Sequence, residues 1–465
     1  MKKQLLLSII CAASALTASA QTALTLSDCR RLAVENNAKV RIAEDGRRAA
    51  TEVSREAFTK YFPQVNASWM GYRSNKGAIQ YTLPSVGQLV PEAGSIIGGA
   101  LPPELAGQVA PLLSKSLGEI ELIKKGWSAG ITAIQPVFMG GQIVNGNRLA
   151  HVGEAVADLR KEEAIDDVIL TAEQYYWQIV TLQSKKQTLQ SVMQMVDTLE
   201  YQVGVAVSAG VILPNDQLKV QLRQGELRAM MVDLDNGIAL ASSLLAQYVG
   251  LSGDSITIVS EPVPDDVPPY PLDIYMEPGQ ALPSTVDYRL LDQNVKASDL
   301  RARIAVGENL PQVGIGAGWI YDDLFSQRHN FAAVMLTVNV PISDWWGGSH
   351  KIKKARIEAE SARIQQEDLS QMLEIGMSSA WDDLTAAHRK MSIAHRSIAQ
   401  AKENLRLNRN YYDAGVATIT DLLDAQTLYR QSLDGYTEAY GAFRQSRARY
   451  LDATGRTTDQ GNFEF

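Results

Sequence analysis

Two carboxylates near the end of the chain are the residues whose spacing most clearly suggests a function. Asp421 and Asp424 lie three residues apart in the first turn of an expected helix, shortly after Gly415. Thr418 or Thr420 can cap that helix, and the helix dipole favours carboxylates in a first turn. A glycine adopts a positive φ without steric cost, so Gly415 can end the preceding helix. These residues predict a tight turn between two helices, with acidic side chains at its exit.

The same arrangement occurs about 205 residues earlier in the chain. The matching pairs are Ala209 with Ala414, Gly210 with Gly415, Val211 with Val416, Asp216 with Asp421, and Gln221 with Gln426. For each glycine taken alone, a plain helix C-cap is the simpler interpretation. The duplication instead predicts two helical hairpins whose tips share one design.

Other candidate chemistry is weak. Gly314, Gly316 and Gly318 alternate within an expected strand and open no helix, so strand packing is favoured over a phosphate loop. His388 and His395 lie one heptad apart, which is not a metal-ligand spacing, so both are expected to be solvated. No serine, cysteine or carboxylate constellation supports catalysis, and we expect neither an enzyme nor a bound cofactor.

Targeting and charge exclude several classes of protein. Residues 1–20 are typical of a signal peptide, with Lys2 and Lys3 before an apolar stretch and a small-residue cleavage site. Without these two lysines the formal net charge of −8 becomes −10, which argues against nucleic-acid binding. Cys11 leaves with the signal peptide, and Cys29 alone cannot form an intrachain disulfide.

The first repeat spans residues 21–250 and combines helices with strands. It begins with a helix from Leu26 to about Tyr61, capped by Ser27. Strands follow at 63–72 and 126–137, because apolar and polar residues alternate there. The residues between them, 73–125, are rich in glycine, proline and serine and are expected to form a long surface loop.

Two very long helices follow. Gly140-Gly141 turns the chain into a helix from about 142 to 208, which would be roughly 100 Å long. The next helix, from about 215 to 249, keeps the 4-3 apolar spacing of a coiled-coil seam. Together they form the first helical hairpin, 142–249, with its tip near Gly210. No globular core requires helices of this length.

A proline-rich connector, 251–283, then leads into a second repeat, 284–454, and a C-terminal tail, 455–465. The second repeat contains strands 311–321 and 331–342, and the Gly347-Gly348 pair is expected to repeat the earlier glycine turn. Its helical hairpin, 349–454, has its tip near Gly415. The chain is therefore expected to be an internal tandem repeat of α+β class.

Four amphipathic strands cannot close a membrane barrel alone, since the smallest barrels need about eight strands and an open edge is not viable in lipid. The expected lipid-facing rows are Val313, Ile315, Ala317, Trp319 and Tyr321, and Val334, Leu336, Val338 and Val340. Three copies would supply twelve strands and close a barrel, with the helices forming a tube of the same symmetry.

The duplicated element order, the opening LTLSDCRRLAVENN, the glycine pairs and the tip AGVATITDLLDAQ together resemble one family. The chain resembles TolC-like outer-membrane efflux proteins. The resemblance implies a homotrimeric channel-tunnel, with a β-barrel in outer-membrane lipid joined to an α-barrel in the periplasm. It also implies export together with a periplasmic adaptor (membrane fusion protein) and an inner-membrane pump of the resistance-nodulation-division or ABC type.

The resemblance assigns the gate to the hairpin tips. Asp421 and Asp424 match the family's paired aspartates, so a trimer would place six carboxylates around a narrow axis and raise some of their pKa values. Tyr412 matches the gate-linking tyrosine, and Asn215 and Asp216 occupy the positions of its usual partners.

The tips also match the family's docking region. The expected adaptor contacts are Gly210, Val211, Gly415 and Val416. Where some members carry an arginine two residues after the second tip glycine, this chain has Ala417, which argues against an arginine latch at that position.

Two other classes of function compete with an export duct. A soluble periplasmic coiled-coil adaptor would explain the hairpins but not the four amphipathic strands. A secreted hydrolase would need an active site, and the sequence supplies no candidate for one.

Overall fold

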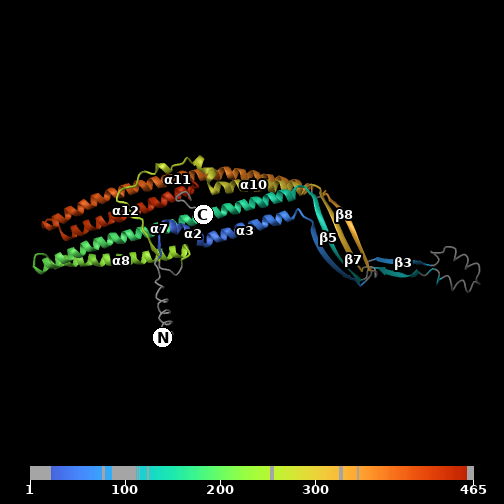
Figure 1. Ribbon diagram of the computed structural model, residues 1–465, viewed down its shortest axis with the longest axis horizontal. Helices are drawn as coiled ribbons and strands as arrows, with labels where there is room; N and C mark the ends of the chain where they lie inside the picture. Colours follow the sequence, from blue (N-terminus) through green and yellow to red (C-terminus); the bar gives the residue numbers. More distant parts are fainter. Residues whose placement is uncertain are drawn as a thin grey trace, which may run out of the picture. The chain divides into compact units, whose positions relative to one another are not determined.

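The computed structural model describes residues 22–75, 79–85, 111–112, 114, 116–122, 125–251, 256–323, 328–342 and 345–457 (Figure 1). The expected signal peptide, 1–20, lies outside them. The chain divides into two compact units. We call Met1–Ser54, Ala150–Asp299 and Ile357–Phe465 the helical unit, and Arg55–Leu149 and Leu300–Arg356 the strand unit.

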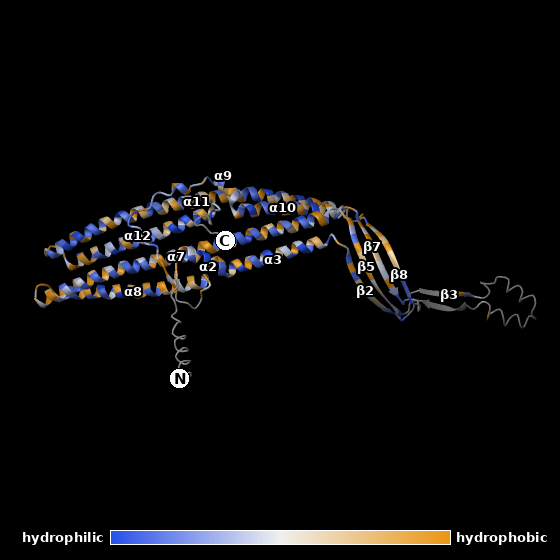
Figure 2. Cartoon of the chain, viewed as in Figure 1, coloured by the Kyte–Doolittle hydropathy of each residue, from blue (hydrophilic) through white to orange (hydrophobic). Residues whose placement is uncertain are grey.

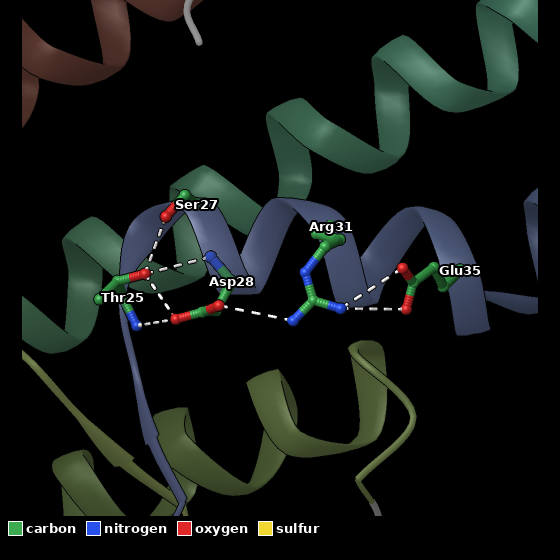
Figure 3. A network of polar contacts seen from close by, with 5 residues as sticks. All are labelled: Thr25, Ser27, Asp28, Arg31 and Glu35. Atoms are coloured by element: carbon green, nitrogen blue, oxygen red, sulfur yellow. Dashed lines mark hydrogen bonds and ion pairs between the residues drawn. The ribbon is translucent and has the colours of Figure 1, made fainter. Parts of the chain in front are cut away.

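The first helix, α2 (Leu26–Asn36), begins with a capping box. Thr25 Oγ1 accepts a hydrogen bond from the Asp28 backbone N–H at 3.2 Å, and Asp28 Oδ2 accepts one from the Thr25 N–H at 3.1 Å (Figure 3). Ser27, the expected cap, instead contacts the Thr25 hydroxyl at 2.9 Å. Thr25 is the N-cap because only the residue before the first helical turn can reach the third helical N–H.

The single helix expected up to about residue 61 is broken at Asn37, where ψ is 135°. A second helix, α3 (Ala38–Thr59), follows. The Asn36 and Asn37 side-chain amides donate to the Val249 and Tyr248 carbonyls at 3.0 and 3.2 Å. These contacts to a distant helix end stabilise the break, and a helical periodicity analysis cannot detect them.

Four long helices dominate the chain: α7 (Gln142–Ser208), α8 (Pro214–Tyr248), α11 (Trp345–Asp413) and α12 (Ile419–Ala453). Gly140 and Gly141, before α7, have φ of 61° and 78°, as a glycine turn requires.

The Gly347-Gly348 pair was expected to repeat this turn, but it lies inside α11. A Cβ on Gly348 would lie 1.5 Å from Asn309 Oδ1. The glycine there gives room for the Asn309 side chain and makes no turn.

The strand unit contains a four-stranded antiparallel sheet in the order β2 (Gln64–Arg73), β5 (Lys125–Met139), β7 (Gln312–Asp322) and β8 (His329–Asn339). Two further strands, β3 (Ile79–Ser85) and β4 (Ser116–Leu122), pair with each other within the stretch expected to be a loop. The sequence analysis did not predict this hairpin.

The register of the sheet gathers the apolar side chains on one face. Ala67 pairs with Ile131, Ile131 with Trp319, and Trp319 with Ala332. Side chains two residues apart on a strand share a face. The residues at every second position from these four therefore form one continuous face across all four strands. The other face carries most of the glycine, serine, threonine, asparagine and glutamine residues of the sheet, together with a few apolar ones such as Ile134 and Met335.

The connector is packed tightly onto the helical unit. Its strand β6 (Ile256–Ile258) pairs in parallel with β1 (Thr22–Leu24). His388 Nε2 bonds to the Pro268 carbonyl at 2.9 Å, and His395 Nε2 bonds to that of Asp265 at 2.8 Å. Both histidines therefore attach the connector to α11 instead of being solvated as expected. The connector ends in three short helices, η2 (Leu272–Ile274), α9 (Pro278–Ala281) and η3 (Leu282–Ser284). The longer helix α10 (Val286–Gly307) follows.

Helix α8 is long and apolar enough, by length and composition, to cross a membrane. Among the described residues it is the one helix that passes that test, and only 17% of its apolar stretch is buried. Apolar residues recur along its length (Figure 2). Its exposed apolar side chains are Leu218, Leu222, Val232, Leu240 and Leu244. A coiled-coil helix whose partner is missing would have such a surface.

Candidate functional site at the hairpin tips

Both hairpin tips end their first helix with the same hydrogen bonds. At the first tip the Val211 N–H donates to the Ala206 carbonyl at 2.9 Å, and Gly210 has φ of 70°. At the second, the Val416 N–H donates to the Tyr411 carbonyl at 2.8 Å, and Gly415 has φ of 74°. This is the Schellman arrangement, in which a glycine in the left-handed region lets the last carbonyls of the helix be satisfied.

The second tip then starts α12 with a capping box. Thr418 Oγ1 accepts from the Asp421 N–H at 3.2 Å, and Asp421 Oδ2 accepts from the Thr418 N–H at 2.8 Å. The Thr418 hydroxyl donates to the same carboxylate oxygen at 2.6 Å. These bonds, first from the hydroxyl and then from the backbone, lower the pKa of Asp421. The pKa of Asp421 is therefore lowered within one protomer, whereas repulsion between carboxylates in a trimer was expected to raise it.

Asp424 differs from Asp421 although it lies only one turn away. It is exposed, and no hydrogen bond or ion pair reaches its carboxylate from any residue that the structure describes. The two aspartates are therefore not equivalent. Asp421 stabilises the start of the helix, whereas Asp424 presents a free charge.

The first tip lacks a capping box. Leu213 occupies the N-cap of α8, where it supplies no side-chain acceptor, and Pro214 follows at the first helical position. The Asp216 carboxylate is therefore available to Lys219, whose Nζ donates to it at 3.1 Å. Asn215 is exposed and precedes this pair.

Tyr412 connects the two tips. It packs against a buried cluster with residues from both hairpins, including Val203 and Val220 from the first and Leu422 from the second. Burial, followed by the charges of Asp216 and Asp413, raises the pKa of Tyr412. The expected gate residues Tyr412 and Asp216 are thus neighbours, but within the described chain no hydrogen bond joins them.

The tips end in exposed apolar side chains. Val211 is 74% exposed and Val416 is 78% exposed. A Cβ added to Gly210 or Gly415 would meet no heavy atom within 4 Å, so the glycines are required by φ and not by crowding. The tips therefore present small apolar knobs with open space around them.

A cavity of about 340 Å³ lies one turn above the second tip. Tyr412, Arg409, Asp413 and Gln426 all line it. The Gln426 Oε1 atom is buried without a hydrogen-bond partner. Sequence analysis did not single out Arg409, although its spacing of three residues from Tyr412 places both on one helix face. No group of three or more potential metal ligands occurs among the described residues.

Part of the chain matches a known protein family. Residues 278–456, which include the second tip and both of its helices, match the family described as outer membrane efflux protein. Over these residues the chain is similar to outer membrane efflux proteins. The match supports a channel component of an efflux system. The soluble adaptor considered as an alternative is not supported.

Solved structures show that the chain shares its fold with several membrane proteins over nearly its whole length. CusC matches with a TM-score of 0.74 at 14% identity, covering 92% of each chain. VceC of Vibrio cholerae matches with a TM-score of 0.69 at 15% identity, covering 92% of this chain and 96% of that one. CmeC of Campylobacter jejuni gives 0.70 at 13% identity, covering 93% and 86%. No curated protein matches the sequence closely enough to count as a relative.

Proposed function

We propose that three copies of this chain form a passive export duct closed at its periplasmic end by the hairpin tips. The observation that carries the trimer is the open sheet. β2 and β8 are its two edges, and neither is paired on its outer side by any described strand. Unpaired strand edges cannot remain exposed in lipid. Three copies of this four-stranded sheet would supply twelve strands and remove every edge.

The helical unit supports the same assembly. α8 carries the exposed apolar stripe described above, and α11 carries a second one. The members of the second stripe are Ile357, Ile364, Met372, Ile375 and Ile393. Helices of a closed tube contact neighbours on both sides, so each protomer needs such surfaces for the next copy. The internal repeat of the two halves would then give a tube of nearly equivalent hairpins.

The gate in this proposal consists of Asp421, Asp424, Tyr412, Asp216 and Asn215. Asp424 is the carboxylate free to face the axis, and Asp421 fixes the helix start that carries it. Three such tips would concentrate negative charge at the constriction and favour cations there. Because Ala417 offers no cation, Arg409, which lines the cavity beside Tyr412, is the nearest candidate for a latch on α11.

The docking surface in this proposal consists of Gly210, Val211, Gly415 and Val416. Their exposure and apolar ends suit a helical partner that inserts small side chains between the tips. The partner class is a periplasmic adaptor, which would link the duct to an inner-membrane pump of the resistance-nodulation-division or ABC type. No catalysis and no cofactor are required of the chain itself.

Planar-bilayer recordings test the gate. Asp424→Asn should reduce cation preference and raise several-fold the concentration of a polyvalent cation needed for half block. Glu367→Gln removes an exposed carboxylate from α11 away from the tip and should change neither property. Equal behaviour of the two variants would refute the assignment of Asp424.

Site-specific crosslinking tests the docking surface. Cys29 is fully buried, and burial raises the pKa of its thiol to about 12, so it should not compete with introduced cysteines. Val211→Cys and Val416→Cys should each crosslink to a periplasmic adaptor protein. A cysteine at exposed Leu244, near the other end of α8, is the control and should not.

A further inference from the structure

We propose that the polar face of the sheet carries a binding site for an amphipathic organic anion, in a cavity where the strands meet the helices. The inference rests on the proposed function, because that face lines the duct only if three copies close the barrel. The cavity has a volume of about 340 Å³ and lies entirely within the strand unit. This is the lower end of the range for small-molecule sites.

The position of the cavity relative to the sheet identifies the source of the ligand. Gly314 pairs with Pro136 and with Thr337, and Gln312 pairs with Asn339. All five of these residues line the cavity. They alternate with the apolar row that contains Ile315 and Trp319, so they face away from the lipid side. Val313 is the one lining residue that belongs to the apolar row. A ligand here would come from the duct and not from the bilayer.

The polar lining favours an anion. Lys60, at the end of α3, is the one charged residue that lines the cavity, and no aspartate or glutamate accompanies it in this described region. Its ammonium has no hydrogen-bond or ion-pair partner among the residues that the structure describes. Gln64, Gln312 and Asn339 add amide donors. A carboxylate or sulfate would neutralise the lysine and accept from these amides.

The rest of the lining is apolar. Ile134, Pro136, Met139 and Ile143 continue the cavity beyond the amides. A short hydrocarbon tail would cover these side chains while its anionic head contacts Lys60. This combination of one cation, several amides and an apolar wall suits an amphipathic anion better than a sugar or a metal ion.

Gly314 keeps the cavity open. A Cβ at this position would lie 3.5 Å from Ile134 Cγ2 and 3.7 Å from Thr337 Oγ1, which are ordinary contact distances. Gly314→Ala would therefore occupy part of the cavity without disturbing the strand. It provides a test that leaves the charge of the site unchanged.

Planar-bilayer recordings with octanoate as the probe test the proposal. Octanoate should reduce the current through the channel in a concentration-dependent way, whereas acetate and octylammonium at the same concentrations should not. Lys60→Gln should raise the half-blocking concentration about tenfold, because it removes a charge-assisted hydrogen bond to the anion. Lys60→Arg should retain block, and Gly314→Ala should weaken it.

Lys125→Gln is the matched control, because it removes an exposed lysine from the opposite end of β5. Block that persists in Lys60→Gln, or equal block by octylammonium, would overturn the proposed site. A wild-type channel that conducts but ignores octanoate would refute this inference alone. A wild-type protein that forms no channel would refute the proposed function instead.

Discussion

At the scale of single residues, Asp421 and Asp424 have different roles although they lie one turn apart at the start of α12. Asp421 is held by Thr418 in a capping box, whereas Asp424 is exposed and unpaired in the described chain. The first tip shows what the threonine contributes. Leu213 stands in its place there, and Asp216 pairs with Lys219 instead of capping the helix. The N-cap residue, three positions before each aspartate, therefore decides whether that carboxylate caps the helix.

Exchanging these caps gives a prediction. Thr418→Ala should lower the stability of the second tip by about 1 kcal/mol, because it removes an N-cap acceptor. Leu213→Thr should stabilise the first tip, because Asp216 already occupies the third position of α8. Hydrogen exchange of the amides in the first turns of α8 and α12 would measure both changes. Faster exchange in α8 of Leu213→Thr would contradict this account.

At the scale of elements, close packing decides which glycines matter. Gly140 has φ of 61°, and a Cβ there would lie 2.2 Å from the Gly307 carbonyl oxygen. Gly347 has neither constraint, since a Cβ there would meet no heavy atom within 4 Å. Both belong to glycine pairs at a strand-to-helix junction, but only one junction depends on its glycine for the turn.

The two positions therefore provide a matched comparison. Gly140→Ala should destabilise the strand unit by at least about 1–3 kcal/mol, from the left-handed conformation alone. Gly347→Ala should be neutral or stabilising, since alanine is the better helix former by about 1 kcal/mol. Thermal unfolding of the purified channel would report both effects. A similar loss of stability in the two variants would contradict the special requirement for glycine at position 140.

Another prediction concerns the contact of α7, α10 and α12, where acidic residues cluster. Burial, followed by the charges of Asp452 and Glu162, raises the pKa of Asp166 to about 7. The folded state therefore retains a proton that the unfolded chain releases near pH 4. The resulting cost to stability should grow as the pH rises from about 4 to 7 and then level off.

Asp166→Asn should remove this cost, leaving the variant more stable than wild type at pH 8 and similar to it at pH 4. Melting temperatures measured across this range test the prediction. Asp421→Asn is a control of opposite sign, because the pKa of Asp421 is lowered and its contribution is lost only as the pH falls below about 4. A parallel pH dependence of wild type and Asp166→Asn would refute the role of the cluster.

At the scale of the whole molecule, each unit leaves surfaces that a single chain does not cover. Among the described strands, none pairs with the outer side of β2 or β8, and α8 and α11 have exposed apolar stripes. Covering both with further copies would satisfy the backbone of the edges and the apolar side chains together. In the proposed trimer, assembly and lipid would together cover this exposed apolar surface.

Leu240→Glu, in the middle of the α8 stripe, should reduce the fraction of detergent-extracted trimer by burying an unpaired charge at the interface. Leu240→Met keeps an apolar side chain of similar size at the same position and should leave the trimer intact. Crosslinking followed by size-exclusion chromatography would measure the two. A wild-type protein found as a soluble periplasmic monomer would contradict the assembly itself.

The sequence alone determined the elements that depend on local chemistry. The uninterrupted helical stretch predicts α7, the positive-φ glycines predict both tips, and strict alternation predicts the four strands of the main sheet. Each of these signals arises from residues a few positions apart, where periodicity and backbone preference are sufficient. The family resemblance was also visible at this level, because its motifs are local.

Only the tertiary structure decided what depends on distant partners. The break at Asn37 is stabilised by the end of α8, Gly348 is needed for the approach of Asn309, and His388 and His395 hold the connector. The β3–β4 hairpin and the cavity beside Lys60 likewise require residues far apart in sequence to meet. Periodicity cannot detect these features, because their free energy comes from long-range packing and hydrogen bonds. The same reason separates Asp421 from Asp424: their spacing is local, but whether each carboxylate is free is decided by the partners around it.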